Sequence, residues 1–206
     1  LFNSGQSCCG IERIYVDKKI YKVFIDGFKS ITENYNLNDP SKSDTNLGPV
    51  VRQSAADFIR TQMKDAESEG AKRLIEESKF TICKEDNCYV CPQVMVDVNH
   101  DMRFMMEETF GPAVGIMPGN DEEEAKNLMN DSPYGLTASV WTKDTEFAKD
   151  FGKSIETGTF FMNRCDYLDP ALAWTGVKDT GIGCSLSTLA FDQFTRPQSF
   201  HIRKVI

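Results

Sequence analysis

The sequence lacks any apolar run that approaches the roughly 18 residues needed to span a membrane, and we therefore exclude a spanning helix in this chain. It also lacks a block of lysine and arginine. The formal net charge is −8, and acidic residues gather in stretches such as DEEEAK at 121–126. Because an acidic chain repels phosphate backbones and anionic lipids, we expect neither nucleic acid nor a membrane surface as a partner.

Histidine is scarce, which limits the metal sites that the chain can build. His100 and His201 are the only two. Cys88 and Cys91 form a C-x-x-C pair with Cys83 close by, and this spacing allows a zinc hypothesis. No second pair of cysteine or histidine follows at a suitable distance along the sequence, so we predict that the protein binds no metal.

The cysteines are not spaced as a disulfide framework. There are seven, an odd number, scattered from Cys8 to Cys184. This usage favours free thiols in the cytoplasm or another reducing compartment. The sequence opens on leucine and reaches a dense motif at once, so we expect a piece of a longer chain whose targeting signals cannot be read here.

Length and hydrophobic patterning predict an α/β fold. The 206 residues, 40% of them hydrophobic and 26% charged, are enough for one sizeable core or two small ones. The patterns predict strands at 13–16, 89–96, 113–118, 136–142 and 158–163, helices at 18–35, 51–66, from 121 onward and 145–155, and a loop at 37–49. Pro92 places its strand at an edge or a bulge. The alternation of strands and helices predicts a mostly parallel sheet with helices on both faces.

The stretch FNSGQSCCG at 2–10 carries the first candidate for chemistry. Gly5 permits a tight bend, and Cys8 is expected at the head of a short helical turn before strand 13–16. Successive N–H groups in such a turn favour a thiolate and stabilise an oxyanion, so Cys8 is a candidate nucleophile. The alternative is a buried structural cysteine, which is the commoner fate of this residue type.

Together with Arg13, this stretch resembles the active-site signature of the NAD(P)-dependent aldehyde dehydrogenase superfamily. The resemblance implies that Cys8 is the nucleophile and that Cys9 is a neighbour without that role. It also implies the fold of the family's catalytic domain, a three-layer sandwich around a mostly parallel sheet.

Two further stretches resemble the parts of the family that bind the cofactor. EETFGP at 107–112 is similar to its nicotinamide-side motif, which implies that Glu108 hydrogen-bonds the nicotinamide ribose and that Phe110 packs near the ring. SPYGLTASVWTKD at 132–144 is similar to a segment that brings Leu136 close to the cofactor. Without the resemblance, the two acids of EETFGP are typical of a solvated surface pair.

The stretch WTGVKDTG at 174–181 resembles the loop that closes the family's substrate tunnel. The resemblance implies that Trp174 faces the tail of the aldehyde and that Leu168 lies on the same loop, which favours medium-chain or aromatic aldehydes. A tryptophan taken alone is more often a core residue. Asp166 and Asp169 either cap turns or, alternatively, anchor an amine-bearing substrate by charge.

Parts of the family's site have no counterpart in this sequence. The general-base glutamate of a Glu-Leu-Gly-Gly motif, the asparagine that completes the oxyanion hole and the Rossmann-type domain all lie upstream of the cysteine in the family. GIGCSL at 181–186 begins like a dinucleotide fingerprint but has Leu186 where the third glycine belongs. Cys184 and Ser185 stand where many relatives have Arg-Glu.

The resemblance implies that residues 1–194 are the catalytic domain and that 195–206 resemble the oligomerisation strand, so a homodimer or homotetramer is expected. The implied activity is oxidation of an aldehyde to a carboxylic acid with NAD or NADP, through a thiohemiacetal and a thioester on Cys8. Without the upstream domain, this chain by itself is expected to be inactive. Two alternatives stay open: a CoA-acylating or reductive member of the superfamily, and a non-enzymatic relative that keeps the fold for structure or assembly.

Overall fold

The computed structural model describes residues 1–165 and 167–205. The chain divides into two compact units, residues 1–133 and residues 134–206. Each unit has its own arrangement of strands and helices, and each is described by itself.

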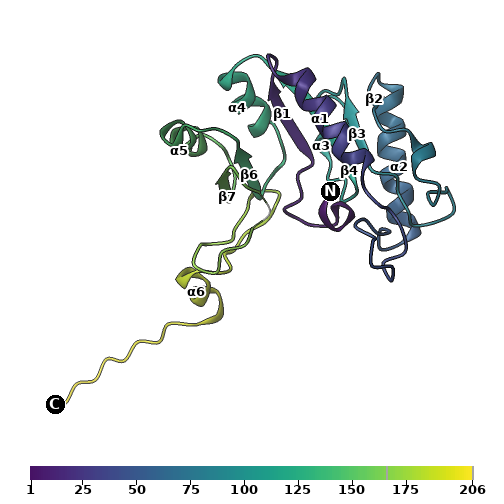
Figure 1. The fold of residues 1–206 in the computed structure, drawn as a ribbon. Coiled ribbons are helices and arrows are strands. Elements are labelled where there is room, and N and C mark those ends of the chain that lie inside the picture. The colour runs from purple at the N-terminus through teal and green to yellow at the C-terminus, as the bar shows by residue number, and fades with distance from the viewer. Residues whose placement is uncertain (166, 206) are drawn as a thin grey trace. The chain divides into compact units, whose positions relative to one another are not determined.

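The first unit is built on a four-stranded sheet in the order β1-β4-β3-β2 (Figure 1). Its strands are β1 (Arg13–Asp17), β2 (Lys72–Arg73), β3 (Gln93–Val96) and β4 (Ala113–Gly119). β4 pairs in parallel with both β1 and β3, whereas the two-residue β2 pairs antiparallel with β3. The prediction of an α/β fold with a mostly parallel sheet is confirmed for this unit.

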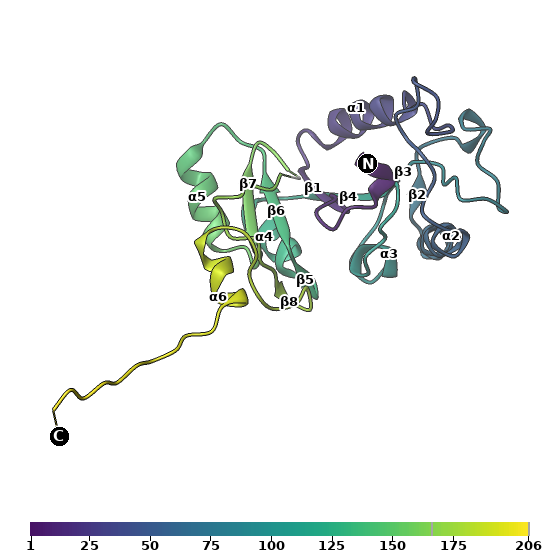
Figure 2. The ribbon, with the colours of Figure 1, turned by 90° about the horizontal axis from the view of Figure 1, so that it is seen from below.

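Helices cover both faces of this sheet (Figure 2). α1 (Tyr21–Glu33) lies on one face, and α2 (Gln53–Ser68) and α3 (Arg103–Met106) lie on the other. α4 (Glu122–Asn130) follows β4, and its N-terminus is capped by Asp121, whose carboxylate accepts the Glu124 N–H at 2.9 Å. Two short 3-10 turns complete the unit, η1 (Phe2–Gly5) and η2 (Glu77–Lys79).

The core of the first unit forms two clusters because successive strand residues point to opposite faces. Met95 of β3 packs with Ile59 and Met63 of α2. Its neighbour Val94 belongs to the other cluster, against which Phe28 of α1 packs. The helical spacing read from the sequence therefore corresponds to helix faces that bury apolar side chains on the sheet.

One strand differs from its prediction. We expected residues 89–96 to form a strand at an edge or bulge because of Pro92, but β3 begins only at Gln93 and lies between β4 and β2. The missing N–H of proline costs no ladder bond here because pairing starts one residue later, where the Gln93 N–H donates to the Pro112 carbonyl at 2.8 Å. A proline directly before a strand is compatible with an interior position.

The second unit holds a parallel pair of strands with a crossover helix. β6 (Thr137–Val140) pairs with β7 (Thr159–Met162), and α5 (Thr145–Lys153) connects them. β5 (Tyr134–Gly135) and β8 (Val177–Lys178) form a separate antiparallel pair. We expected one sheet to hold all the strands, whereas the described strands form one sheet of four and two sheets of two. Hydrophobic periodicity predicts strands but carries no information on which strands share a hydrogen-bond ladder.

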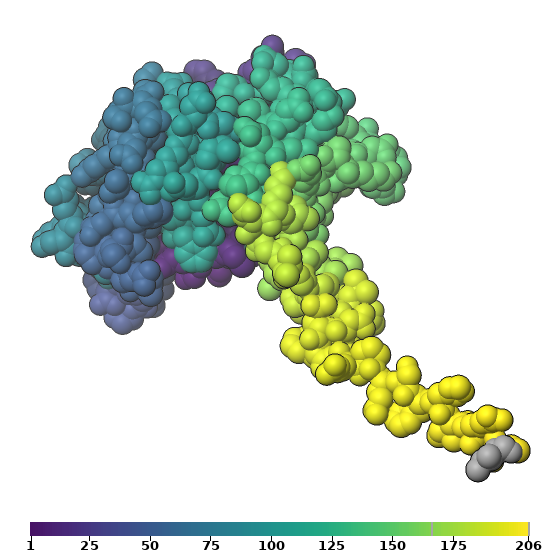
Figure 3. All heavy atoms as spheres, turned by 180° about the vertical axis from the view of Figure 1, so that it is seen from behind, coloured from purple at the N-terminus to yellow at the C-terminus, as the bar shows by residue number. Residues whose placement is uncertain are grey.

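The chain ends in an exposed segment. After η3 (Thr188–Ala190) and α6 (Phe191–Phe194), residues 195–205 form no helix or strand and all are exposed. This yellow segment is uncovered on the face seen in Figure 3. Its pairing with another subunit stays a prediction. Within the residues described, none of the helices has the length and apolar character that crossing a membrane requires.

Candidate active site

The backbone immediately before Cys8 is bent through the left-handed region. Asn3, Ser4 and Gly5 have φ of 51°, 56° and 75°. Gly5 is needed for two reasons: its φ favours glycine, and a Cβ added there would lie 1.8 Å from the carbonyl oxygen of Gly111. The expected tight bend at Gly5 is confirmed, and it brings the chain against the EETFGP segment.

Hydrogen bonds hold this bend to the loop that precedes α2. The Ser4 hydroxyl is buried and donates to the Gly48 carbonyl at 2.7 Å. The Gln6 amide oxygen accepts the Val51 N–H at 2.8 Å, and its nitrogen donates to the Pro49 carbonyl at 3.4 Å. The sequence motif did not reveal these contacts, because they join residues more than 40 positions apart.

Cys8 lies in the tight turn that follows. The Gly10 N–H donates to the Ser7 carbonyl at 2.9 Å, so Cys8 and Cys9 are the two central residues. We expected Cys8 at the head of a helical turn, but the short helical turn is η1, which ends at Gly5 before the cysteine is reached. A second bend of the chain therefore presents the thiol.

The two cysteines of this turn have different surroundings. Cys8 is exposed, and within the described part of the chain its N–H has no acceptor. Cys9 is 5% exposed, and its sulfur lies 3.3 Å from the Ser7 hydroxyl. Of the two cysteines in this turn, Cys8 is the one whose thiol is exposed to solvent.

A carboxylate between the turn and β1 reaches the EETFGP segment. Both oxygens of Glu12 accept the Thr109 N–H at 3.0 Å, and one of them accepts the Phe110 N–H at 2.8 Å. Burial raises the pKa of the Glu12 carboxyl, although these two N–H groups oppose that shift. Sequence reasoning missed Glu12. The available signal was an acid placed directly before the predicted strand at 13–16.

Glu108 and Phe110 lie on the same short segment, on either side of a buried residue. Glu108 is exposed and Phe110 is 40% exposed, whereas Thr109 between them is 2% exposed. Phe110 has φ of 49°, an uncommon conformation for a large side chain. Gln62 of α2, fully buried, donates from its side-chain nitrogen to the Glu108 carbonyl at 3.5 Å.

The remaining predicted residues lie in the second unit. Trp174 lines a cavity of about 120 Å³, together with side chains that include Phe161, Tyr167 and Leu172. Leu168 is 52% exposed and does not contribute to this lining. Leu136 is half-buried at the bend between β5 and β6.

The structure describes only one of the two acids that allowed an amine-binding hypothesis. The Asp169 carboxylate accepts the Ala171 N–H at 2.9 Å, so it caps a turn while also lining the cavity. Asp166 lies outside the described residues. The Asp169 contact favours the turn-capping interpretation.

The metal hypothesis finds no geometric support. Among the described residues, no group of three or more histidine, cysteine, aspartate or glutamate side chains is placed to hold a metal ion. The Cys91 thiol instead donates to the Pro92 carbonyl at 3.6 Å. The influence of the two thiols on each other lowers the pKa of Cys83 and raises that of Cys91.

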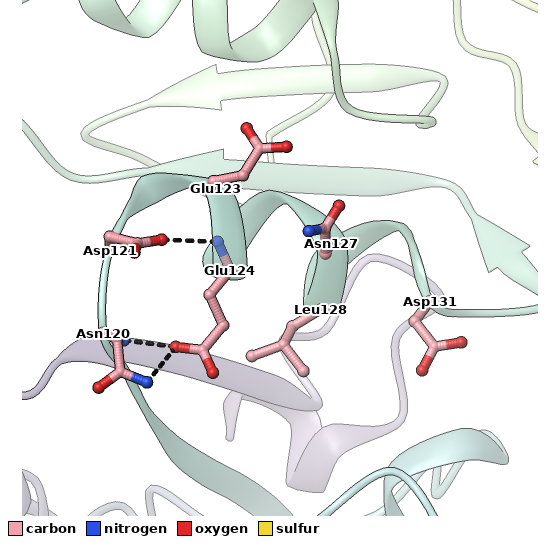
Figure 4. A pocket seen from close by; sticks show the side chains of 7 residues that line it. All are labelled: Asn120, Asp121, Glu123, Glu124, Asn127, Leu128 and Asp131. Carbon is pink, nitrogen blue, oxygen red and sulfur yellow. Dashed lines mark hydrogen bonds between the residues drawn. The ribbon is translucent and has the colours of Figure 1, made fainter.

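A larger hollow of about 640 Å³ lies beside α4 and is rich in carboxylates (Figure 4). Asp121 caps the helix, and Glu124 accepts the N–H and side-chain amide of Asn120. Asp131 binds the His100 ring at 2.6 Å. These carboxylates are engaged by their neighbours, and no predicted site residue lies among them.

Comparison with known proteins gives one consistent family. The model of the aldehyde dehydrogenase family matches residues 1–200. The 3-sulfolactaldehyde dehydrogenase of Priestia megaterium is 34% identical over 194 residues, which cover 94% of this chain and 39% of that protein. This chain therefore spans about two fifths of the length of such relatives.

The solved structures that this chain resembles are also aldehyde dehydrogenases. Lactaldehyde dehydrogenase from Escherichia coli has a TM-score of 0.89 at 28% identity, over 96% of this chain and 41% of that one. Betaine aldehyde dehydrogenase from Staphylococcus aureus, solved in complex with NAD+, has a TM-score of 0.86 at 28% identity, over 93% of this chain and 38% of that one.

Proposed function

Because the chain belongs to the aldehyde dehydrogenase family, we propose that it is the catalytic-domain part of an NAD(P)-dependent aldehyde dehydrogenase that oxidises an aldehyde to a carboxylic acid. The observation that carries this proposal is the exposed Cys8 on the turn from Ser7 to Gly10. Cys9, the adjacent thiol, is buried and serves as an internal contrast.

The side chains near this turn fit the nicotinamide side of NAD or NADP. Glu108 offers an exposed carboxylate, which is the acceptor that two ribose hydroxyls require. Phe110 offers a partly exposed aromatic surface, suited to packing against a flat ring. These two residues would hold the nicotinamide riboside. The partners for adenine and pyrophosphate would lie in the length of such relatives that this chain does not span.

In the proposed reaction, the Cys8 thiolate attacks the carbonyl carbon of the aldehyde, a C–S bond forms, and the carbonyl electron pair moves onto oxygen. The Cys8 N–H, which has no acceptor in the described part of the chain, is available to stabilise that oxyanion. When bound, the nicotinamide ring supplies the acceptor for the hydride that leaves the same carbon. The thioester left on Cys8 is then hydrolysed by water that a general base activates.

We further propose that medium-chain or aromatic aldehydes are preferred. The cavity beside Trp174 is lined mainly by aromatic and aliphatic side chains, which favours an apolar tail. The engagement of Asp169 with the Ala171 N–H supports a turn-capping role for that acid. Leu168 would then contribute less to substrate contact than Trp174.

The experiment that tests the proposal compares the two cysteines of the turn in the full-length enzyme. Cys8→Ser should lower aldehyde oxidation by at least about 1,000-fold, because removing a covalent nucleophile removes the reaction path itself. Cys9→Ser is the matched control, since Cys9 is adjacent but buried, and it should retain most of the activity. Iodoacetamide should label Cys8 faster than the other cysteines, as followed by peptide mass spectrometry.

Near-normal oxidation by Cys8→Ser would overturn the assignment. Equal loss of activity in both variants, with no preferential labelling of Cys8, would also contradict it, because the turn would then act only as structure.

A further inference from the structure

Glu12 makes contacts that the chemistry of Cys8 does not account for. Its carboxylate is directed to the Thr109 and Phe110 N–H groups, at 2.8–3.0 Å. Burial raises the pKa of this carboxyl, so ionised Glu12 carries a free-energy cost in the fold. A neutral side chain with no such contact would avoid that cost.

The segment that Glu12 contacts is held in an uncommon conformation. Phe110 has φ of 49°, a backbone conformation that is strained for a large non-glycine residue. Successive N–H groups that converge on one acceptor offset that strain and fix the backbone at this point. The exposed side chains of Glu108 and Phe110 flank the buried Thr109, so the direction in which they point depends on this backbone.

The same segment is contacted from both sides of the cysteine turn. Before the turn, Gly5 packs so closely on Gly111 that no Cβ fits between them. After the turn, Glu12 accepts the N–H groups of Thr109 and Phe110. The stretch that carries Cys8 and the stretch that carries Glu108 are therefore joined at two points.

We propose that Glu12 is a positioning residue, which fixes the Thr109–Phe110 backbone so that Glu108 and Phe110 are presented to the nicotinamide riboside half of the cofactor. This inference rests on the proposed function. Glu12 touches neither the aldehyde nor the cofactor, and its effect is transmitted through the two N–H groups that it accepts. Its loss should therefore weaken one half of the dinucleotide site and leave the other half intact.

The test uses two variants of Glu12 in the full-length enzyme. Glu12→Gln keeps the length of the side chain but leaves one acceptor oxygen and turns an NH2 group toward the N–H groups; Glu12→Ala removes both acceptors. The matched control is Glu124→Gln, because Glu124 also accepts a backbone N–H but does so beside α4. Calorimetry measures the dissociation constants of NAD, or of NADP if the wild type prefers it, and of ADP, which lacks the nicotinamide riboside.

We expect dinucleotide affinity to fall by about fivefold in Glu12→Gln and by more than about tenfold in Glu12→Ala, as the loss of hydrogen bonds to a charged acceptor predicts. Affinity for ADP should stay within about twofold of the wild type in every folded variant. Glu124→Gln should change neither constant.

Unchanged dinucleotide affinity in a folded Glu12→Ala enzyme would overturn the inference. A parallel fall in dinucleotide and ADP affinity, or failure of both Glu12 variants to fold by circular dichroism, would also overturn it, because Glu12 would then be a structural residue. If the wild-type enzyme binds neither NAD nor NADP, it is the proposed function that fails, and that outcome is distinct from the others.

Discussion

At the scale of single residues, the bend before Cys8 places three successive residues in the left-handed region. Two of them, Asn3 and Ser4, are not glycine, and such residues each cost roughly 1–2 kcal/mol in this conformation. The Ser4 hydroxyl bond to Gly48 and the Gln6 bonds to Pro49 and Val51 offset that cost. A strained backbone that several hydrogen bonds hold in place is typical of functional turns.

Gly5→Ala tests the bend. The new Cβ would meet the Gly111 carbonyl at 1.8 Å and sit on a backbone with φ of 75°, so we expect the free energy of unfolding to fall by at least about 2 kcal/mol. Urea unfolding followed by circular dichroism measures it. Gly27→Ala is the matched control, because nothing lies within 4 Å of its added Cβ on α1, and it should gain about 0.5–1 kcal/mol.

Equal stability of the Gly5 and Gly27 variants would contradict the strained bend. At this scale, the sequence predicted the tight bend at Gly5, because that bend is a local property of a motif. It did not predict Glu12, whose partners lie 97 and 98 positions away, or Gln62, which is 46 positions from Glu108. The Glu12 contact depends on the pairing of β1 with β4, which sets Arg13 beside Gly115.

At the scale of elements, the hydrophobic periodicity of the sequence predicted the positions of most strands and helices correctly. β1, α1, α2, β4 and α5 fall within a few residues of their predicted ranges, because burial on one face imposes a period that is visible in the sequence. The position of β3 inside its sheet and the division of the strands into three sheets were not predicted. Those features depend on hydrogen bonds between strands, which the period of one strand does not record.

The loop that carries Trp174 gives a prediction at this scale. Truncation by Trp174→Ala should raise KM for a bulky aromatic aldehyde by about tenfold and leave KM for acetaldehyde nearly unchanged, because lost apolar contact scales with the area covered. Trp141→Ala is the control, since Trp141 is 67% exposed and does not line the cavity. Steady-state kinetics with the two aldehydes measures the difference.

Asp166→Asn provides the opposing test for this loop. If that variant selectively lost activity on an aminoaldehyde that the parent enzyme prefers, the apolar assignment of the cavity would be wrong. An equal rise of KM for both aldehydes in Trp174→Ala would also count against it.

At the scale of the whole molecule, this chain spans about two fifths of the length of relatives such as the Priestia enzyme. We expect the general base and the adenine side of the cofactor site in the length that it does not span. We therefore predict that these 206 residues alone do not oxidise aldehydes and bind NAD only weakly. Calorimetry that detected micromolar binding of NAD to this chain would contradict the prediction.

The central claim is that Cys8 forms the covalent bond to the substrate. The most direct measurement is to quench the full-length enzyme during turnover of a slow aromatic aldehyde with NAD, digest it, and search the peptides by mass spectrometry for an added acyl group. We predict a thioester on Cys8, absent when NAD is omitted and absent in Cys8→Ser. An acyl group on Cys9 or on another residue, or steady turnover with no modified Cys8 peptide under conditions that preserve thioesters, would contradict the claim.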